Sequence, residues 1–175
     1  MKIIDLKKQL NGMEKIELIN LISKLYKASK QAQSIIDVEL CGESVEEQLV
    51  ADNKKKIHTA FFGNRLSLKN ARTVISDFKK VSKNRENIAE LMLFYVECGV
   101  EFTNMYGDID EAFYYSIESM FVEFVRVLNN LDSEAYYLRN AERIKKMYLA
   151  SDGIGWGFSE EMSNIYYEIQ WHEEE

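Results

Sequence analysis

Apolar side chains recur at three- and four-residue steps through most of this chain, and no proline interrupts them. Phe113, Ile117 and Phe124, for example, fall on one face of a helix. Average usage would give about eight prolines in a chain of this length. Because proline breaks helix interiors and also serves loops, its absence fits a chain that is mostly helix with short connections. The sequence therefore predicts an all-α fold.

Glycines divide the chain into segments, because a glycine after a periodic run is typical of a helix C-terminus. We predict a compact multi-helix bundle of about seven to eight helices, with mostly antiparallel neighbours because the loops are short. The length suits a single helical domain over residues 1–175. The predicted helices cover residues 13–29, 31–41, 44–62, 67–82, 85–106, 109–130, 133–151 and 159–171, with a short turn at 5–10.

Short polar side chains precede several of these segments and are the expected N-caps. The residues that stand just before an apolar-periodic run are Ser67, Asn84, Asp132 and Ser159. Asp108, with Glu111 three residues later, has the spacing of a capping box. We therefore expect Asp108 to begin the helix over 109–130.

The segment 85–106 has little polar surface, which is typical of a central helix packed on most sides. Gly99 lies inside this segment, where a glycine costs about 1 kcal/mol relative to alanine. A close approach of a neighbouring helix would explain that glycine, and a kink would explain it nearly as well.

Composition favours a cytoplasmic protein. The only cysteines, Cys41 and Cys98, lie in helical patterns and imply no disulfide framework. Lysines break the apolar residues at the N-terminus, which is therefore not expected to be a signal peptide. No stretch approaches the roughly 18 uncharged apolar residues of a membrane-spanning helix, so no membrane association is expected.

Charge is segregated along the chain. Residues 53–85 hold ten Lys or Arg side chains and one acid, whereas residues 86–125 hold nine acids and no Lys or Arg. The basic segment could form an anion site, which would include nucleic acid among its ligands. The favoured interpretation is a solvated face that complements a neighbouring acidic helix, and with a net charge of −7 nucleic-acid binding is the less expected function. The candidate anion-binding residues are Lys69, Arg72, Lys80 and Lys83.

The acidic segment places Glu90, Glu97 and Glu101 on one narrow stripe of the near-apolar helix. Convergent carboxylates can bind a hard cation or perform acid–base chemistry. The favoured interpretation is simpler, because a helix needs some polar surface and these acids supply it. The candidate ligand- or partner-binding residues are Glu97, Glu101, Asp108, Asp110 and Glu118 from this segment, together with Trp156.

We predict no metal site, no cofactor and no catalytic residue. The histidines, His58 and His172, lie far from each other and from both cysteines in sequence, so no zinc ligand set forms. The Glu-x-x-His pairs of di-iron bundles are absent, as is the G-x-S-x-G elbow of serine hydrolases. An enzyme is accordingly the less favoured class, although its exclusion would need more than missing motifs.

Three alternating glycines flank Ile154 and Trp156 and are followed by Phe158. The favoured interpretation is a sharp chain reversal in which Trp156 fills part of the core. An exposed Trp156 would instead indicate a binding hot spot.

The string Tyr95–Thr103, then Tyr106–Glu111, resembles a bacterial family catalogued as domain of unknown function 6155. The strings Ile154–Phe158 and Ile165–Glu168 resemble the end of the same family. The resemblance covers the C-terminal half well and the N-terminal half loosely. It implies a small bacterial cytoplasmic helical protein, and it supplies no activity, ligand or catalytic residue.

These observations favour a non-enzymatic helical domain that binds another macromolecule, most simply a protein or a second copy of itself, since segregated charge can steer and orient a partner. The first alternative is a small-ligand or metal-binding bundle that uses the carboxylates. The second is a nucleic-acid-associated factor that uses residues 53–85. The partner hypothesis expects apolar side chains on the surface, and a uniformly polar surface would count against it.

Overall fold

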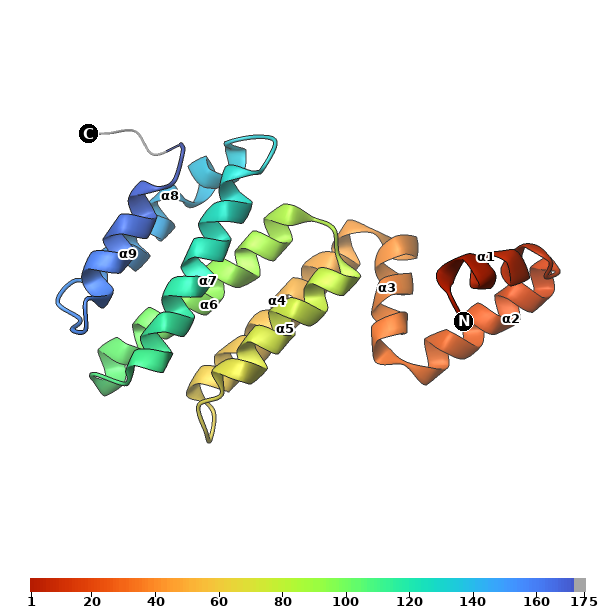
Figure 1. The fold of residues 1–175 in the computed structure, drawn as a ribbon, viewed down its shortest axis with the longest axis horizontal. Helices are drawn as coiled ribbons and strands as arrows, with labels where there is room; N and C mark the ends of the chain where they lie inside the picture. Colours follow the sequence, from red (N-terminus) through yellow and green to blue (C-terminus); the bar gives the residue numbers. More distant parts are fainter. Residues whose placement is uncertain (172–175) are drawn as a thin grey trace. The chain divides into compact units, whose positions relative to one another are not determined.

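A computed structural model describes residues 1–171, which form nine α-helices and no strand (Figure 1). The all-α prediction is confirmed, with slightly more helices than expected because the turn at 5–10 is a full helix. The helices are α1 (Ile3–Asn11), α2 (Lys15–Ala28), α3 (Lys30–Cys41), α4 (Glu43–Phe62), α5 (Leu68–Val81), α6 (Arg85–Tyr106), α7 (Glu111–Asn129), α8 (Ala135–Leu149) and α9 (Phe158–Tyr167).

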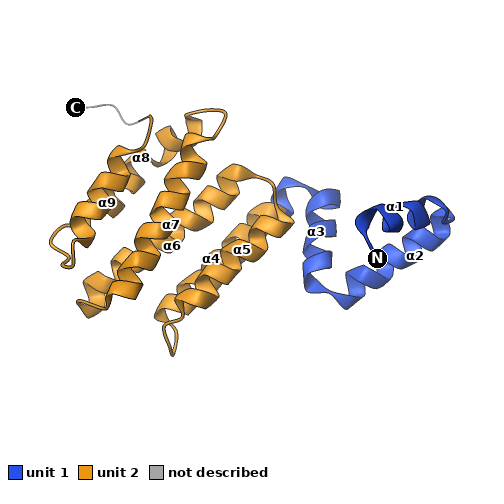
Figure 2. Ribbon diagram, viewed as in Figure 1, with its two compact units in different colours: residues 1–45 blue, residues 46–175 orange. Residues whose placement is uncertain are grey.

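The helices divide into two compact units, residues 1–45 and residues 46–175 (Figure 2). The expectation of a single helical domain over residues 1–175 stays a prediction. Among the described residues 1–171, no helix is both long and apolar enough to cross a membrane.

The first unit contains α1, α2 and α3, and none of the residues in these helices is buried. The hydroxyl of Tyr26 on α2 donates a hydrogen bond to Asp37 Oδ1 on α3 at 3.0 Å and accepts one from the Gln33 amide. Several isoleucines and leucines stay exposed, as expected for a unit of this size, which buries too little surface for a full core. They are Ile3, Ile4, Ile16, Ile19, Ile22, Leu25, Ile35 and Leu40.

The second unit is organised around α6 and α7, which pack against each other most extensively. The short connection 107–110 makes them antiparallel neighbours. The helix α5 packs on α6, whereas α8 packs on both α6 and α9, and α9 also packs on α7 (Figure 1). The prediction that residues 85–106 form a central helix is confirmed, because α6 contributes ten buried residues.

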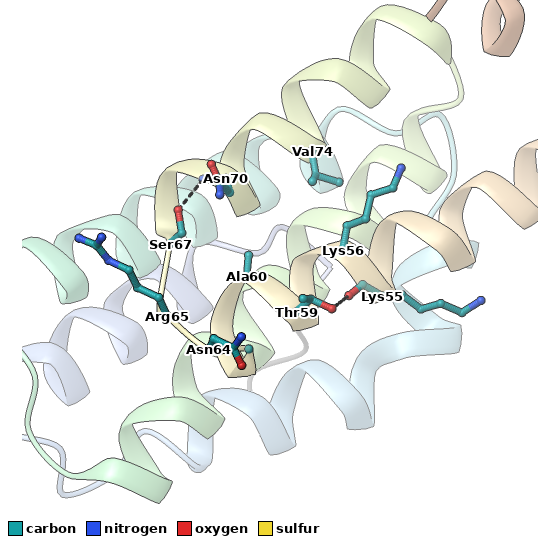
Figure 3. A pocket seen from close by; sticks show the side chains of 10 residues that line it. Lys55, Lys56, Thr59, Ala60, Asn64, Arg65, Ser67, Asn70 and Val74 are labelled. Carbon is teal, nitrogen blue, oxygen red and sulfur yellow. Dashed lines mark hydrogen bonds between the residues drawn. The ribbon is translucent and has the colours of Figure 1, made fainter. Parts of the chain in front are cut away.

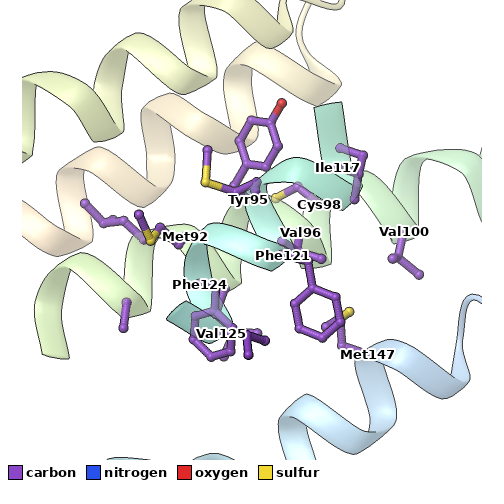
Figure 4. Close-up of a cluster of buried hydrophobic side chains, with 14 of the residues drawn as sticks. Met92, Tyr95, Val96, Cys98, Val100, Ile117, Phe121, Phe124, Val125 and Met147 are labelled. Carbon is purple, nitrogen blue, oxygen red and sulfur yellow. The ribbon is translucent and has the colours of Figure 1, made fainter. Parts of the chain in front are cut away.

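The core between α6 and α7 is close-packed (Figure 4). Tyr95, Val96 and Phe121 are buried here, and the ring of Tyr95 meets Phe61 of α4 edge-on at 5.1 Å between centroids. A Cβ added at Gly99 would clash with the side chain of Ile117. Of the two explanations for Gly99, close approach of a neighbouring helix is therefore the one that applies.

Helix starts follow the predicted caps at α5 and α6. The predicted caps Asp132 and Ser159 are wrong, because Glu134 precedes α8 and Gly157 precedes α9. Ser67 Oγ accepts from the Asn70 amide, and Asn84 Oδ1 accepts from the amides of Glu86 and Asn87. The helix α7 is capped by Asp110, whose Oδ1 accepts from the Phe113 amide at 2.8 Å, and not by Asp108. Asp108 precedes the cap because Gly107, with φ of +84°, turns the chain before the helix begins.

Candidate functional site

The carboxylate stripe of α6 lies against α8 and is paired with a basic side chain of that helix. Arg143 binds Glu97 in a bidentate pair, with Nε to Oε1 at 2.6 Å and Nη2 to Oε2 at 2.7 Å. The Nη1 group of Arg143 also donates to both oxygens of Glu90, at 2.8 and 2.9 Å. One guanidinium therefore joins two carboxylates that lie one heptad apart on α6.

Two further groups complete the environment of Glu90. Lys54 on α4 forms an ion pair with Oε1, and the hydroxyl of Tyr136 on α8 donates to Oε2 at 2.9 Å. Burial acts to raise the pKa of Glu90, but Lys54 and Arg143 outweigh it and hold that pKa below its ordinary value. Burial, and then the neighbouring carboxylate of Glu90, raises the pKa of the Tyr136 hydroxyl, which stays protonated as a donor.

We call the contact formed by Lys54, Glu90, Glu97, Tyr136 and Arg143 the α6–α8 seam. All of its charges have partners of opposite sign, so its arrangement is that of a structural network. The seam continues at both ends: Arg139 pairs with Glu86 at 2.6 Å, and the Asn104 amide donates to the Ala150 carbonyl at 2.8 Å.

The basic and acidic segments also pair with each other across α5 and α7. Arg72 binds Glu123 at 3.0 Å and donates to the carbonyl of Ser116 and the hydroxyl of Ser119. Lys79 reaches the second oxygen of Glu123 at 3.3 Å. This pairing is the arrangement that the favoured interpretation of the charge segregation expected.

The four candidate anion-binding residues do not form one site. Arg72 forms its ion pair with Glu123 of α7, and Lys80 pairs with Asp77 on its own helix at 2.7 Å. Lys69 and Lys83 are exposed and make no ion pair with any described residue. A separate basic pocket of about 550 Å³ lies between α4 and α5, but the charged ends of Lys55 and Arg65 point to opposite sides of it (Figure 3).

The candidate carboxylates are likewise distributed over several places. Glu97 belongs to the α6–α8 seam, Asp110 caps α7, and Asp108 lies within 3.4 Å of the Tyr114 hydroxyl. Glu101 and Glu118 line two different pockets. Within the part of the chain that the structure describes, no group of three His, Cys, Asp or Glu side chains could hold a metal ion. The candidate histidine His172 lies outside the described residues.

Glu101 lies in a pocket of about 590 Å³ beside the seam, between α6 and α8. Its floor is apolar and includes Phe94, Val100 and Met147, whereas Glu97 and Lys146 lie at its polar edge. Burial, then the charges of Glu101 and Glu97, raises the pKa of the Cys98 thiol to about 12. The thiol is therefore protonated at neutral pH and is a poor nucleophile.

The expected role of Trp156 in the core is wrong, because its side chain is 70% exposed. Its backbone has φ of +63°, the left-handed region that residues other than glycine rarely adopt. Phe158 fills the core in its place: it is fully buried, and its ring lies 4.8 Å from that of Tyr114 between centroids. Gly157, with φ of +75°, turns the chain between the outward-facing Trp156 and the buried Phe158.

Trp156 borders a recess of about 400 Å³ at the N-terminal end of α7. Tyr115, 71% exposed, supplies a second aromatic ring, and the carboxylates of Glu111 and Glu118 complete the wall. The volume is near the lower end of the roughly 300–1,000 Å³ of ligand sites. We call this feature the aromatic recess; the remainder of its lining is Ala112 and Tyr114.

Several residues of these sites were not among the sequence candidates, and for two of them, Arg143 and Tyr115, the sequence held a signal. Arg143 lies outside both charge-segregated segments, although Tyr136, Arg139 and Arg143 recur at helical spacing and could have been matched to the stripe on α6. Tyr115 falls off the apolar face formed by Phe113 and Ile117, which was a signal for exposure.

Comparison with known proteins adds no homologue. No family model matches the chain, and neither a curated protein nor a solved structure matches it. The resemblance to domain of unknown function 6155 thus stays an expectation.

Proposed function

We propose that this chain is a non-enzymatic helical domain that binds another protein through the aromatic recess. The observation that carries the proposal is the exposure of Trp156 and Tyr115 around one concave surface. Tryptophan and tyrosine dominate the hot spots of protein interfaces, because each buries a large rigid area at a small entropic cost. The side chain of Trp156 is exposed and therefore does not stabilise the core, although its backbone conformation is an unfavourable one.

Exposed apolar side chains of the first unit support the same class of function. Eight isoleucine and leucine residues of α1, α2 and α3 are exposed, among them Ile16, Ile19 and Leu25 of α2. Apolar side chains gathered on a surface are typical of protein association. The recess is the stronger argument, because it combines rings, carboxylates and a concave shape within one unit.

The test is the capture of a partner by the tagged full chain from its native host, followed by chemical cross-linking. We expect a defined protein to be cross-linked to the recess by the wild type and to be lost from Trp156→Ala. The matched control is Leu138→Ala, which removes an apolar side chain that is 62% exposed on α8. Equal capture by all three proteins would overturn the proposal.

A small-ligand function is the second candidate, and the pocket between α6 and α8 favours it. The pocket combines an apolar floor with Glu101, a carboxylate that has no cationic partner among the described residues. Native mass spectrometry of the protein purified from its host tests this function. Met105 also lines the pocket, and Met105→Glu is the variant expected to lose a bound ligand. The nucleic-acid alternative has less support, because Arg72 and Lys79 are engaged with Glu123.

A further inference from the structure

The aromatic recess carries a charge as well as rings, and this charge indicates what it binds. Glu111 and Glu118 line it from α7. Burial, then the negative charge of Glu161 on α9, raises the pKa of the Glu118 carboxyl. Glu118 therefore faces a like charge across the contact between α7 and α9, and no cation offsets it in the recess.

The sequence around the recess contains almost no basic residue that could offset the charge of Glu118. There is no Lys or Arg from residue 86 to residue 125, and none after Lys146. The helix α9 and the loop that carries Trp156 are therefore free of basic residues, and the one basic residue of α7, Arg126, lies in its last turn. Among the described residues, Glu111, Glu118 and Glu161 form no ion pair.

Several other carboxylates of the second unit pair with basic side chains of neighbouring helices. Glu90 and Glu97 share Arg143, and Glu123 has both Arg72 and Lys79. A half-buried carboxylate without a partner lowers the stability of the folded chain. Glu118 thus has no cation beside it within the described chain, and a positively charged group from outside would offset its charge.

We propose that the aromatic recess binds a segment of the partner protein that presents an arginine or lysine side chain. The cation would lie over the exposed ring of Trp156 or Tyr115, an arrangement favourable by about 0.5 to 2 kcal/mol according to its exposure. The aliphatic stem of the same side chain would pack on the rings, as long basic side chains commonly do. Its charged end would then reach Glu111 and Glu118, where hydrogen bonds between charged groups are the strongest.

This inference rests on the proposed function, since it names the chemistry of the partner at the same site. The probe is a fluorescein-labelled hexa-arginine peptide, titrated into the full chain at low salt and followed by fluorescence anisotropy. We expect Glu118→Gln and Trp156→Ala each to weaken binding about ten-fold, equivalent to about 1.4 kcal/mol. The control Glu142→Gln neutralises an exposed acid on α8 and should leave the affinity within about two-fold, because it changes only the long-range attraction.

The outcomes separate the two proposals. Equal affinity in all variants, or an equal loss in all, would show only attraction to a chain of net charge −7 and would overturn this inference. The inference also fails if hexa-arginine does not bind while Trp156→Ala still loses its cellular partner, but the proposed function then survives. Trp156-dependent self-association of the chain would assign the recess to a second copy and would likewise overturn the inference. Failure of both experiments would remove both proposals.

Discussion

The α6–α8 seam and the aromatic recess are built from carboxylates of the same acidic segment, yet they have opposite properties. In the seam, Arg143 lies between Glu90 and Glu97, and the pKa of Glu90 is lowered despite its burial. In the recess, Glu118 faces Glu161 without a cation, and its pKa is raised. The two shifts differ in sign because Glu90 has cations beside it, whereas Glu118 has burial and a second carboxylate.

The aromatic residues show the same contrast within three residues of the chain. Phe158 is fully buried against Tyr114, whereas Trp156 is exposed at the edge of the recess. A buried ring contributes to folding in proportion to the area it removes from water, and an exposed ring contributes to binding.

The largest expected effect compares these two rings. Phe158→Ala should lower the free energy of unfolding by about 4 kcal/mol, because it leaves a cavity in a closed part of the core. Trp156→Ala should change it by less than about 0.5 kcal/mol, as for most surface substitutions. Urea denaturation followed by circular dichroism measures both, and a large loss for Trp156→Ala would mean that the indole serves the fold after all.

The second-largest effect on the free energy of unfolding is expected in the α6–α8 seam. Arg143→Met keeps the length of the side chain but removes the shared cation, so the free energy of unfolding should fall by about 2 kcal/mol. This is less than the roughly 3–5 kcal/mol of a fully buried pair, because the seam retains some contact with water. The control is Arg139→Met, whose exposed pair with Glu86 should contribute less than about 1 kcal/mol. Similar losses for both variants would contradict the distinction between the seam and the surface.

Acid should weaken the seam with a defined sign. Because the folded-state pKa of Glu90 is lowered, its contribution is fully present above the pKa of the unfolded chain and is lost as pH falls through the folded value. The difference in the free energy of unfolding between the wild type and Glu90→Gln should therefore shrink between neutral and acidic pH.

The smallest expected effect has the opposite sign. Glu118→Gln should raise the free energy of unfolding at pH 7 by less than about 1 kcal/mol, since a partly exposed carboxylate is screened by water. Because the folded-state pKa of Glu118 is raised, the gain should appear as pH rises through that value and vanish below the pKa of the unfolded chain. A loss of stability at pH 7 would show that Glu118 has a favourable partner in the fold, and it would remove the contrast between recess and seam.

The sequence by itself determined the secondary structure and the central element of the core. Periodicity and glycine positions predicted the helices closely, because both depend on neighbours three or four residues apart. The near-apolar character of α6 could be predicted for the same reason. The N-caps Ser67 and Asn84 could also be predicted from the local sequence. Asp110 replaced Asp108 as the cap of α7 because the two candidates are two residues apart and only the turn at Gly107 decides between them.

Only the tertiary structure decided which charges and rings have partners. The stripe of Glu90 and Glu97 was visible in the sequence, but its partner Arg143 lies 46 or more residues away and is chosen by the packing of α8 on α6. The direction of Trp156 was set in the same way, because the chain turns at Trp156 and Gly157, both with positive φ, and Phe158 packs beside Tyr114 in the core. Local patterns determine which residues can form a helix, whereas the pairing of side chains depends on contacts between segments that are distant in sequence.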